Sequence, residues 1–350
     1  MRAVWLVFLL GCPTPDDTDS EPAETDTGDS TVETTDTDET DPVDTDDTDV
    51  PADEGTWIIG SILSFGGDTA LTPFALNLDA EPLEAVLLPN VEPGNGAVWE
   101  MVAHPSLPVV YQMVFTSNPD GARIDKVELP SGDRTEIQTD AGFPLVSADG
   151  SHLIFNNPDG ETLVRGLDAE GDPTGTTALL SENLPTALVG DLWTELLTVE
   201  PYTGAGPVTL VYDLEGFTDN LPLTGEGCRF AEDGDLYCHY NGAIRKRSLS
   251  GEYDPFLEVD DLPTGILPLD LIPEDFNAIL PIDGRGLLMS VEGYIPETFS
   301  WCSSVGLLSD DGEWTDLTDV IGALVDPDVD SDCPNNRFSL TMRRAHAPFN

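Results

Sequence analysis

Two short patterns recur in a fixed order through residues 56–350, and this repeat restricts the possible folds more than any other feature of the sequence. The first pattern is a turn followed by an apolar strand, as in Ser-Ala-Asp-Gly-Ser-His-Leu-Ile-Phe at Ser147–Phe155. Its turns fall at positions 106, 149, 191, 233 and 283, which are 43, 42, 42 and 50 residues apart. A spacing this regular predicts a repeated structural unit of about 42 residues.

The second pattern closes each repeat with a strand that ends in Leu, an often acidic residue and a turn. Its copies are Leu78-Asp79, Leu129-Pro130, Leu167-Asp168, Leu214-Glu215, Leu249-Ser250 and Leu308-Ser309. The segments between these markers are short, rich in β-branched and aromatic residues, and bounded by Gly, Pro, Asp and Asn, which is typical of strands. Residues 316–325 are the stretch that favours a short helix.

Together the two markers predict an all-β fold, with one β-propeller of about six four-stranded blades over residues 56–350. We expect the strand Thr56–Ile62 to pair with Phe338–Met342 in one blade, because that pairing removes the exposed sheet edges of an open ring. The alternative is an irregular pair of β-sandwiches with a chance spacing of turns.

One copy of the repeat also resembles a known family. Ser147–Phe155 resembles the blade signature Ser-Pro-Asp-Gly-x-x-ψ-ψ-Phe of TolB-type and related WD-like β-propellers, in which ψ is an apolar residue. Ala148 stands where the family has Pro, and the Gly-His and Trp-Asp pair of stricter WD repeats does not occur. The resemblance spans residues 57–345 and implies a propeller fold.

Residues 1–11 have the organisation of a secretion signal, in which Arg2 precedes an apolar run that is too short to span a bilayer. Leu9-Leu10-Gly11-Cys12 resembles the bacterial lipobox. The resemblance implies that the Cys12 thiol receives a diacylglycerol, that the chain is cleaved before Cys12, and that acyl chains anchor it in a lipid bilayer. The alternative is a short apolar leader with a chance cysteine.

Residues 12–55 are predicted to form a disordered acidic tether behind this anchor. The segment from Pro13 to Gly55 has 18 acidic residues, no basic residue and no apolar periodicity. Such a segment cannot bury enough surface to offset the loss of chain entropy on folding. Pro13, rather than Asp, follows the cysteine, and the sorting rule of enteric lipoproteins then indicates a cell-envelope protein in the outer membrane of a Gram-negative bacterium.

The negative charge of the chain is not confined to the tether. The whole chain has a net charge of −54, and residues 56–350 contain 49 acidic and 12 basic residues, a net of −37. A surface with this charge repels phosphate backbones, so we expect no nucleic acid among the partners. It favours solubility, cation binding or a basic partner.

Four cysteines besides Cys12 predict two disulfides, because thiols oxidise in an exported protein. Cys228 and Cys238 flank Asp233-Gly234, a sequence typical of a β-hairpin turn. A three-residue loop, Glu232–Gly234, places the two cysteines directly opposite each other, at a distance that a disulfide accepts. The alternative is a zinc site formed by these two thiols and His239.

The loop before the last predicted strand carries two further expectations. Cys302 and Cys333 pair by elimination, which would clip this loop to the last blade. Alternating carboxylates, which supply the hard oxygen ligands that calcium prefers, occur at Asp326, Asp328, Asp330 and Asp332. Ser331 and Arg337 stand where an EF-hand needs Gly and Glu, so the loop is either a different kind of calcium site or a solvated acidic loop.

The remaining chemistry-bearing residues favour binding over catalysis. Histidines occur only at His104, His152, His239 and His346, which lie in different repeats without a metal-ligand spacing. The nucleophile-elbow, P-loop and dinucleotide-binding motifs do not occur in the sequence. We therefore expect a non-catalytic binding or scaffold module that engages a protein or ligand through its propeller loops and needs no cofactor apart from calcium. The alternative is a propeller hydrolase or lyase with a metal in the central channel.

Overall fold

The computed structural model describes residues 56–64, 70–92, 96–116, 121–180, 187–194, 196–201, 208–213, 223–224, 226–248, 253–267, 271–295, 300–325 and 338–345. The chain divides into two compact units, Met1–Val50 and Pro51–Asn350, and every described residue belongs to the second. The predicted signal peptide, Cys12 and the predicted tether therefore lie outside the described residues.

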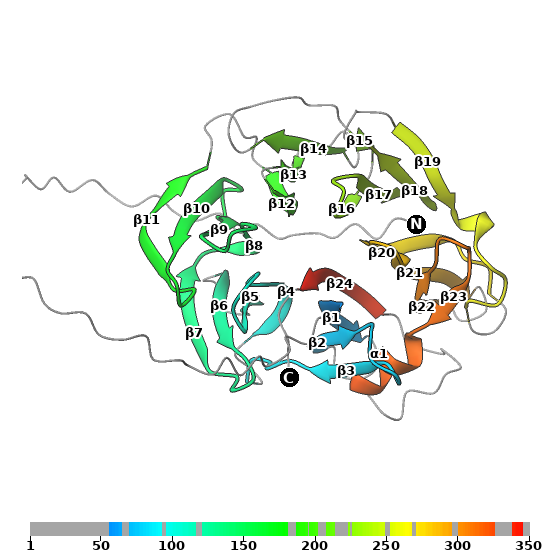
Figure 1. Ribbon diagram of the computed structural model, residues 1–350, viewed down its shortest axis with the longest axis horizontal. Helices are drawn as coiled ribbons and strands as arrows, with labels where there is room; N and C mark the ends of the chain where they lie inside the picture. The colour runs from blue at the N-terminus through cyan, green and yellow to red at the C-terminus, as the bar shows by residue number, and fades with distance from the viewer. Residues whose placement is uncertain are drawn as a thin grey trace, which may run out of the picture. The chain divides into compact units, whose positions relative to one another are not determined.

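The second unit is an all-β propeller of six four-stranded sheets arranged in a ring (Figure 1). From the innermost strand outward, the sheets are β24 (Phe338–Ala345), β1 (Trp57–Ser64), β2 (Ala70–Asn77), β3 (Glu84–Leu87); β4 (Ala97–Ala103), β5 (Val109–Phe115), β6 (Ala122–Glu128), β7 (Arg134–Thr139); β8 (Gly142–Val146), β9 (His152–Asn156), β10 (Thr162–Leu167), β11 (Pro173–Leu179); β12 (Ala187–Trp193), β13 (Leu196–Pro201), β14 (Val208–Asp213), β15 (Leu223–Thr224); β16 (Glu226–Phe230), β17 (Leu236–Tyr240), β18 (Ala243–Arg247), β19 (Tyr253–Glu258); and β20 (Asp275–Ile282), β21 (Gly286–Ile295), β22 (Ser300–Leu308), β23 (Trp314–Asp316). This confirms the predicted six blades. The predicted short helix is α1 (Thr318–Val325), and a 3-10 turn, η1, covers Val259–Asp261.

The ring closes by pairing the first and last described strands. β24 and β1 are antiparallel over their full length, with Ile62 opposite Leu340 and Gly60 opposite Met342. The predicted partnership of the two terminal strands is therefore confirmed. Because the strand that arrives last in the sequence becomes the innermost strand of the first blade, the ring has no unpaired break between blades.

The two sequence markers correspond to two sets of turns on the same face of the propeller. The first marker joins the innermost strand of a blade to the next strand, as at residues 147–151 between β8 and β9. The second follows the third strand, as at Leu167 between β10 and β11. The turn predicted at position 191 was wrong. Asp191 lies within β12, which continues to Trp193 through a register shift between Val189 and Leu192.

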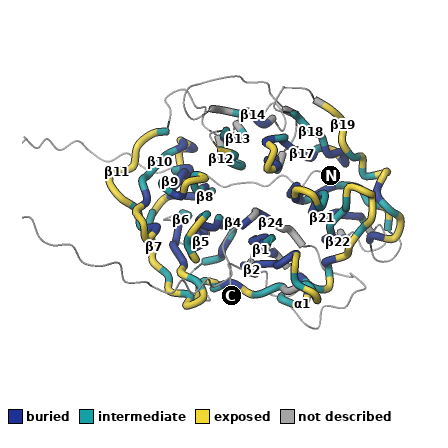
Figure 2. Tube along the Cα trace, viewed as in Figure 1, coloured by how far each residue is buried: buried dark blue, intermediate teal, exposed yellow. Residues whose placement is uncertain are grey.

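The core lies between neighbouring blades, which pack face to face. One apolar cluster joins Ile58, Ile62 and Met342 of the closing blade to Leu280 and Leu288 of the preceding one. Inner strands are largely buried, whereas an outermost strand such as β11 is exposed along most of its length (Figure 2). Because neighbouring blades cover both of its faces, the second strand of a blade, such as β5, is mostly apolar and is buried from Val109 to Val114.

The hairpin β16–β17 carries the predicted disulfide between Cys228 and Cys238, whose Cα atoms are 4.2 Å apart. Arg229 pairs with Tyr237, and the Ala231 amide donates to the Asp235 carbonyl at 2.8 Å. The loop between them is therefore three residues long, as predicted. The zinc alternative is wrong, because both thiols are consumed in the bond.

The structure describes only one of the two cysteines in the second predicted disulfide. Cys302, on β22, is buried and disulfide-bonded. Its predicted partner Cys333 lies outside the described residues, as do the four aspartates of the predicted calcium loop. The pairing of Cys302 with Cys333 and the calcium site stay predictions. Among the described residues, no helix has both the length and the apolar character needed to cross a bilayer.

Candidate functional site

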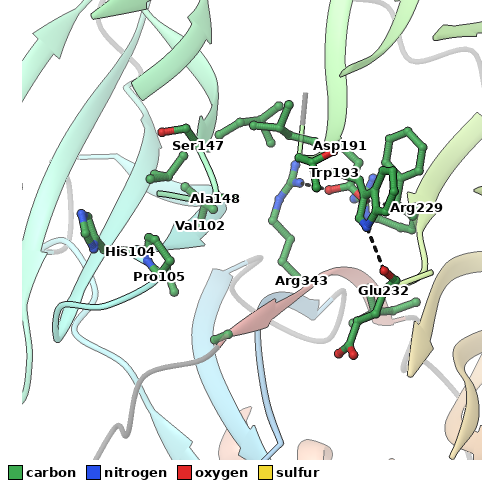
Figure 3. A pocket seen from close by; sticks show the side chains of 18 residues that line it. Val102, His104, Pro105, Ser147, Ala148, Asp191, Trp193, Arg229, Glu232 and Arg343 are labelled. Carbon is green, nitrogen blue, oxygen red and sulfur yellow. Dashed lines mark hydrogen bonds and ion pairs between the residues drawn. The ribbon is translucent and has the colours of Figure 1, made fainter. Parts of the chain in front are cut away.

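A pocket of about 330 Å³ lies where the innermost strands of all six blades end. Its lining includes Pro105, Ala148 and Glu232 from the turns after these strands, and Trp193, the last residue of β12 (Figure 3). Three charged side chains from within the strands line it as well: Asp191, Arg229 and Arg343. Six unrelated stretches of sequence therefore contribute to one concave surface, which is the usual form of a ligand site.

The charged side chains belong to a network of four residues, called here the basal network: Glu100 on β4, Asp191 on β12, Arg229 on β16 and Arg343 on β24. Arg343 donates through Nη1 to Asp191 Oδ1 and through Nη2 to Glu100 Oε2, both at 3.2 Å. Nη2 also donates to the Gly190 carbonyl at 2.9 Å. One side chain of the closing strand therefore ties three blades together.

Arg229 is bound mainly to backbone carbonyls of the inner strands. Its Nη1 donates to the Cys228 carbonyl at 3.0 Å and to the Gly190 carbonyl at 3.4 Å, and its Nε donates to the Met342 carbonyl at 3.4 Å. Burial, and secondarily the neighbouring Arg343, lower the pKa of Arg229. The pocket thus contains two guanidinium groups whose charges disfavour each other in a largely desolvated place.

Trp193 forms one wall of the pocket. Its Nε1 donates to the Glu232 carbonyl at 3.0 Å, and its ring lies 6.3 Å from that of Phe230. The other side of the ring packs on the turn at Gly234, where an added Cβ atom would lie 2.6 Å from the indole and where φ is +88°. Only glycine accepts both conditions, so the Asp-Gly turn predicted from the sequence also fixes the orientation of this indole.

His104 lines the pocket but has both ring nitrogens engaged. Nδ1 accepts from the Ser106 amide at 3.2 Å, so Nε2 carries the proton and donates to the Gly150 carbonyl at 3.1 Å. Burial lowers the pKa of His104, so the imidazole is neutral at pH 7.

His152 lies on β9 and His239 on β17, in other blades, so the described histidines do not converge. Within the described ranges, no three His, Cys, Asp or Glu side chains are placed to share a metal ion.

His239 makes the stability of the propeller sensitive to acid. Burial lowers the pKa of His239 to about 4, with Asp275 acting to raise it and Arg229 to lower it further. The unfolded chain, whose histidine pKa is near 6.5, then binds a proton more tightly than the folded chain does. The folded state should therefore lose about 3 kcal/mol as the pH falls from 6.5 to 4, and nothing further from this group below that range.

The measurement is urea unfolding of the wild type and of His239→Gln at several pH values between 7 and 4. Titration of the many carboxylates is common to both proteins and cancels in the difference between them. We expect the wild type to lose more stability than the variant on acidification. Parallel stability curves would show that the imidazole is not held neutral in the folded state.

The pocket contains none of the site residues predicted from the sequence. Cys12 and the calcium aspartates lie outside the described residues, and neither Cys228 nor Cys238 lines the pocket. A signal was nevertheless present. Residues 56–350 contain only 12 basic residues, and one of them, Arg229, lies within the hairpin predicted between Cys228 and Cys238. An arginine in a strand that is expected to be buried is unusual, and a count of charges alone overlooks it.

Comparisons with known proteins give likenesses only at the level of structure. No family model and no curated protein matches the sequence. Among solved structures, TolB from Acinetobacter baumannii is similar at 15% identity and a TM-score of 0.47, over 76% of this chain and 67% of that one. A putative TolB from Agrobacterium tumefaciens is similar at 14% identity and a TM-score of 0.45, over 75% and 88%. A putative 6-phosphogluconolactonase from Bacteroides uniformis is similar at 13% identity and a TM-score of 0.43, over 74% and 82%.

Proposed function

We propose that this chain is an exported lipoprotein, anchored in the cell envelope through acylated Cys12, whose propeller is a non-catalytic binding module. The observation that carries the proposal is the convergence of all six blades on one pocket at a single face. The pocket combines an aromatic wall with charged groups fixed by neighbouring strands, which is the composition expected of a site that orients a ligand. No nucleic acid is expected as a partner, because the net charge of residues 56–350 is −37.

The acidic segment between Cys12 and the propeller fits this role as a spacer. As a flexible coil, the 43 residues from Pro13 to Gly55 would span roughly 35 Å. Repulsion among its 18 acidic residues would lengthen it further. A tether of this reach would hold the pocket away from the bilayer surface, where a partner has access to it.

The binding role is tested by blocking the pocket with Ala148→Trp, because Ala148 is exposed on the rim. Ala169→Trp is the matched control, since Ala169 is exposed in an equivalent turn of the same blade but does not line the pocket. We expect molecules that co-purify with the wild type from envelope extracts to be retained by Ala169→Trp and lost with Ala148→Trp. Equal retention by the two variants would contradict a binding role for the pocket.

The anchor is tested by replacing Cys12 with serine. We expect the wild type to incorporate labelled palmitate and to partition into the detergent phase, because acyl chains on this residue provide the membrane affinity. Cys12→Ser should incorporate none and remain in the aqueous phase, whereas Cys302→Ser, which removes a disulfide-bonded cysteine elsewhere in the chain, should label like the wild type. Equal labelling of the Cys12→Ser protein would rule out lipidation at this site.

A further inference from the structure

The charged groups at the base of the pocket are satisfied within the protein. Both Nη atoms of Arg343 donate to neighbouring strands, Nη1 to Asp191 Oδ1 at 3.2 Å and Nη2 to the Gly190 carbonyl at 2.9 Å. The other carboxylate oxygen of Asp191 accepts from the Phe230 amide at 2.9 Å. The basal network contains two arginines and two acids, so its formal charges cancel. A charged group of a ligand would therefore gain no unmatched partner from this network.

Apolar side chains, among them Val102, Leu192 and Trp193, form most of the remaining lining. The hydrogen bond from Trp193 Nε1 to the Glu232 carbonyl, 3.0 Å long, holds the indole in place (Figure 3). A volume of about 330 Å³ is at the lower end of the range for small-molecule sites. The interior of the pocket therefore suits one uncharged apolar group, such as a single side chain of a partner.

The mouth of the pocket, in contrast, carries four exposed carboxylates, called here the mouth acids: Asp149, Glu232, Asp233 and Asp283. Glu232 lines the pocket, and Asp233 follows it in the same turn. Asp283 accepts from the Glu232 amide through Oδ1 at 3.2 Å, and Asp149 lies in the turn between β8 and β9 that contributes to the lining. Hydrogen bonds from two neighbouring serines hold the pKa of Asp149 below its usual range, so this carboxylate is charged at neutral pH.

The negative charge continues across the whole face of the propeller around this mouth. The described turns that follow the first and third strands of the blades contain 14 acidic residues and one basic residue, whereas the described connections at the opposite face contain 8 acidic residues. The ion pairs at the turns of the pocket face are Arg285–Asp79, Lys126–Asp172 and Lys246–Asp235. Each of these pairs neutralises a carboxylate outside the mouth acids. A surface of this kind attracts cationic partners and repels anionic ones.

We propose that this face binds a basic polypeptide segment of another protein, which inserts one apolar side chain into the pocket and places flanking lysines or arginines over the mouth acids. The inference rests on the proposed binding role of the pocket and adds the chemistry of the partner. Burial of the apolar side chain would supply affinity, and the surrounding carboxylates would steer the segment and select its charge. A second copy of this chain does not fit, because residues 56–350 have a net charge of −37.

The test is a fluorescence-anisotropy titration of the full-length protein with three capped, labelled peptides: Lys-Lys-Phe-Lys-Lys, Lys-Lys-Ser-Lys-Lys and Glu-Glu-Phe-Glu-Glu. We expect the first to bind and the other two to bind at least about tenfold more weakly, because one lacks the apolar side chain and the other is repelled. The acidic segment before the propeller attracts both basic peptides alike, so the difference between them reports on the pocket. Equal binding of the two basic peptides, equal binding of the acidic peptide, or no binding of the first would each overturn the inference.

A matched pair of double variants tests the contribution of the mouth acids. Asp149→Asn combined with Asp283→Asn removes two charges but keeps the side-chain oxygens that accept the local hydrogen bonds, and it should weaken binding of Lys-Lys-Phe-Lys-Lys by about three- to tenfold. The control, Asp260→Asn combined with Asp261→Asn, removes two exposed charges from η1 at the opposite face and should change binding by less than about twofold. Equal effects of the two double variants would overturn the inference.

The pocket variants separate this inference from the proposed function. Ala148→Trp should weaken binding of Lys-Lys-Phe-Lys-Lys at least about tenfold, whereas Ala169→Trp should bind it like the wild type. Equal binding by these two variants would place the peptide outside the pocket and overturn the inference. If the peptide fails to bind the wild type while Ala148→Trp still loses envelope partners that Ala169→Trp retains, the inference of a basic partner is wrong and the binding role stands.

Discussion

Replacing Arg343 with methionine should destabilise the propeller by about 3–5 kcal/mol, the usual cost of removing one partner from a buried ion pair. Arg343 is only 6% exposed, and its loss leaves the carboxylates of Glu100 and Asp191 without the cation that binds them both. The Gly190 carbonyl loses a donor as well. Urea unfolding followed by tryptophan fluorescence measures the loss.

The control for this prediction is Arg285→Met. Arg285 forms an ion pair with Asp79 near the surface, where its side chain is 32% exposed. Because surface pairs of this kind contribute little, we expect a loss of no more than about 1 kcal/mol. A similar small loss in the Arg343 variant would mean that water reaches the basal network and that the network is not a structural tie.

Ending the chain at Val325 should abolish the native fold altogether. The truncation removes β24, the innermost strand of the first blade, and leaves β1 without its hydrogen-bonded neighbour along Trp57–Ser64. It also removes Met342 from an apolar cluster shared with Ile58 and Ile62. An open ring with an exposed inner edge is expected to aggregate. Near-ultraviolet circular dichroism and limited proteolysis report the loss of fixed tertiary packing.

A deletion at the other end of the chain provides the control. Removing residues 13–50 takes away 38 residues, more than the 25 lost in the truncation, but none of the described strands. We expect this variant to keep the unfolding midpoint of the full chain. A truncated chain ending at Val325 that unfolds cooperatively at the same midpoint would contradict the role assigned to the closing strand.

The features that the sequence predicted correctly depend on local patterns. Asp233-Gly234 selects a tight turn, and the turn length alone sets the register that brings Cys228 opposite Cys238. The blade number follows from turns repeated about every 42 residues, and each turn is specified by a few adjacent residues. Closure of the ring was also predictable. If every blade has four strands, the first and last strands of the domain are completed only by pairing with each other in one blade.

The pocket could not be predicted in the same way, because its parts are distant in the sequence. Glu100 and Arg343 are separated by 243 residues, and no local pattern marks either as the partner of the other. Asp191 was assigned to a turn, since Gly190-Asp191 resembles the Asp-Gly turns of the other blades. The register shift in β12 instead keeps it in the strand, which directs its carboxylate to Arg343 and Phe230.

The pairing of β24 with β1 also sets the order in which the molecule can be completed. The strands of the five other blades are contiguous in sequence, so each sheet can form as soon as its own segment is available. The remaining blade must wait for Phe338–Ala345, and its long-range pairing with Trp57–Ser64 is entropically the slowest to form. If the chain is exported as proposed, the ring cannot close until the segment Phe338–Ala345 has itself crossed the membrane.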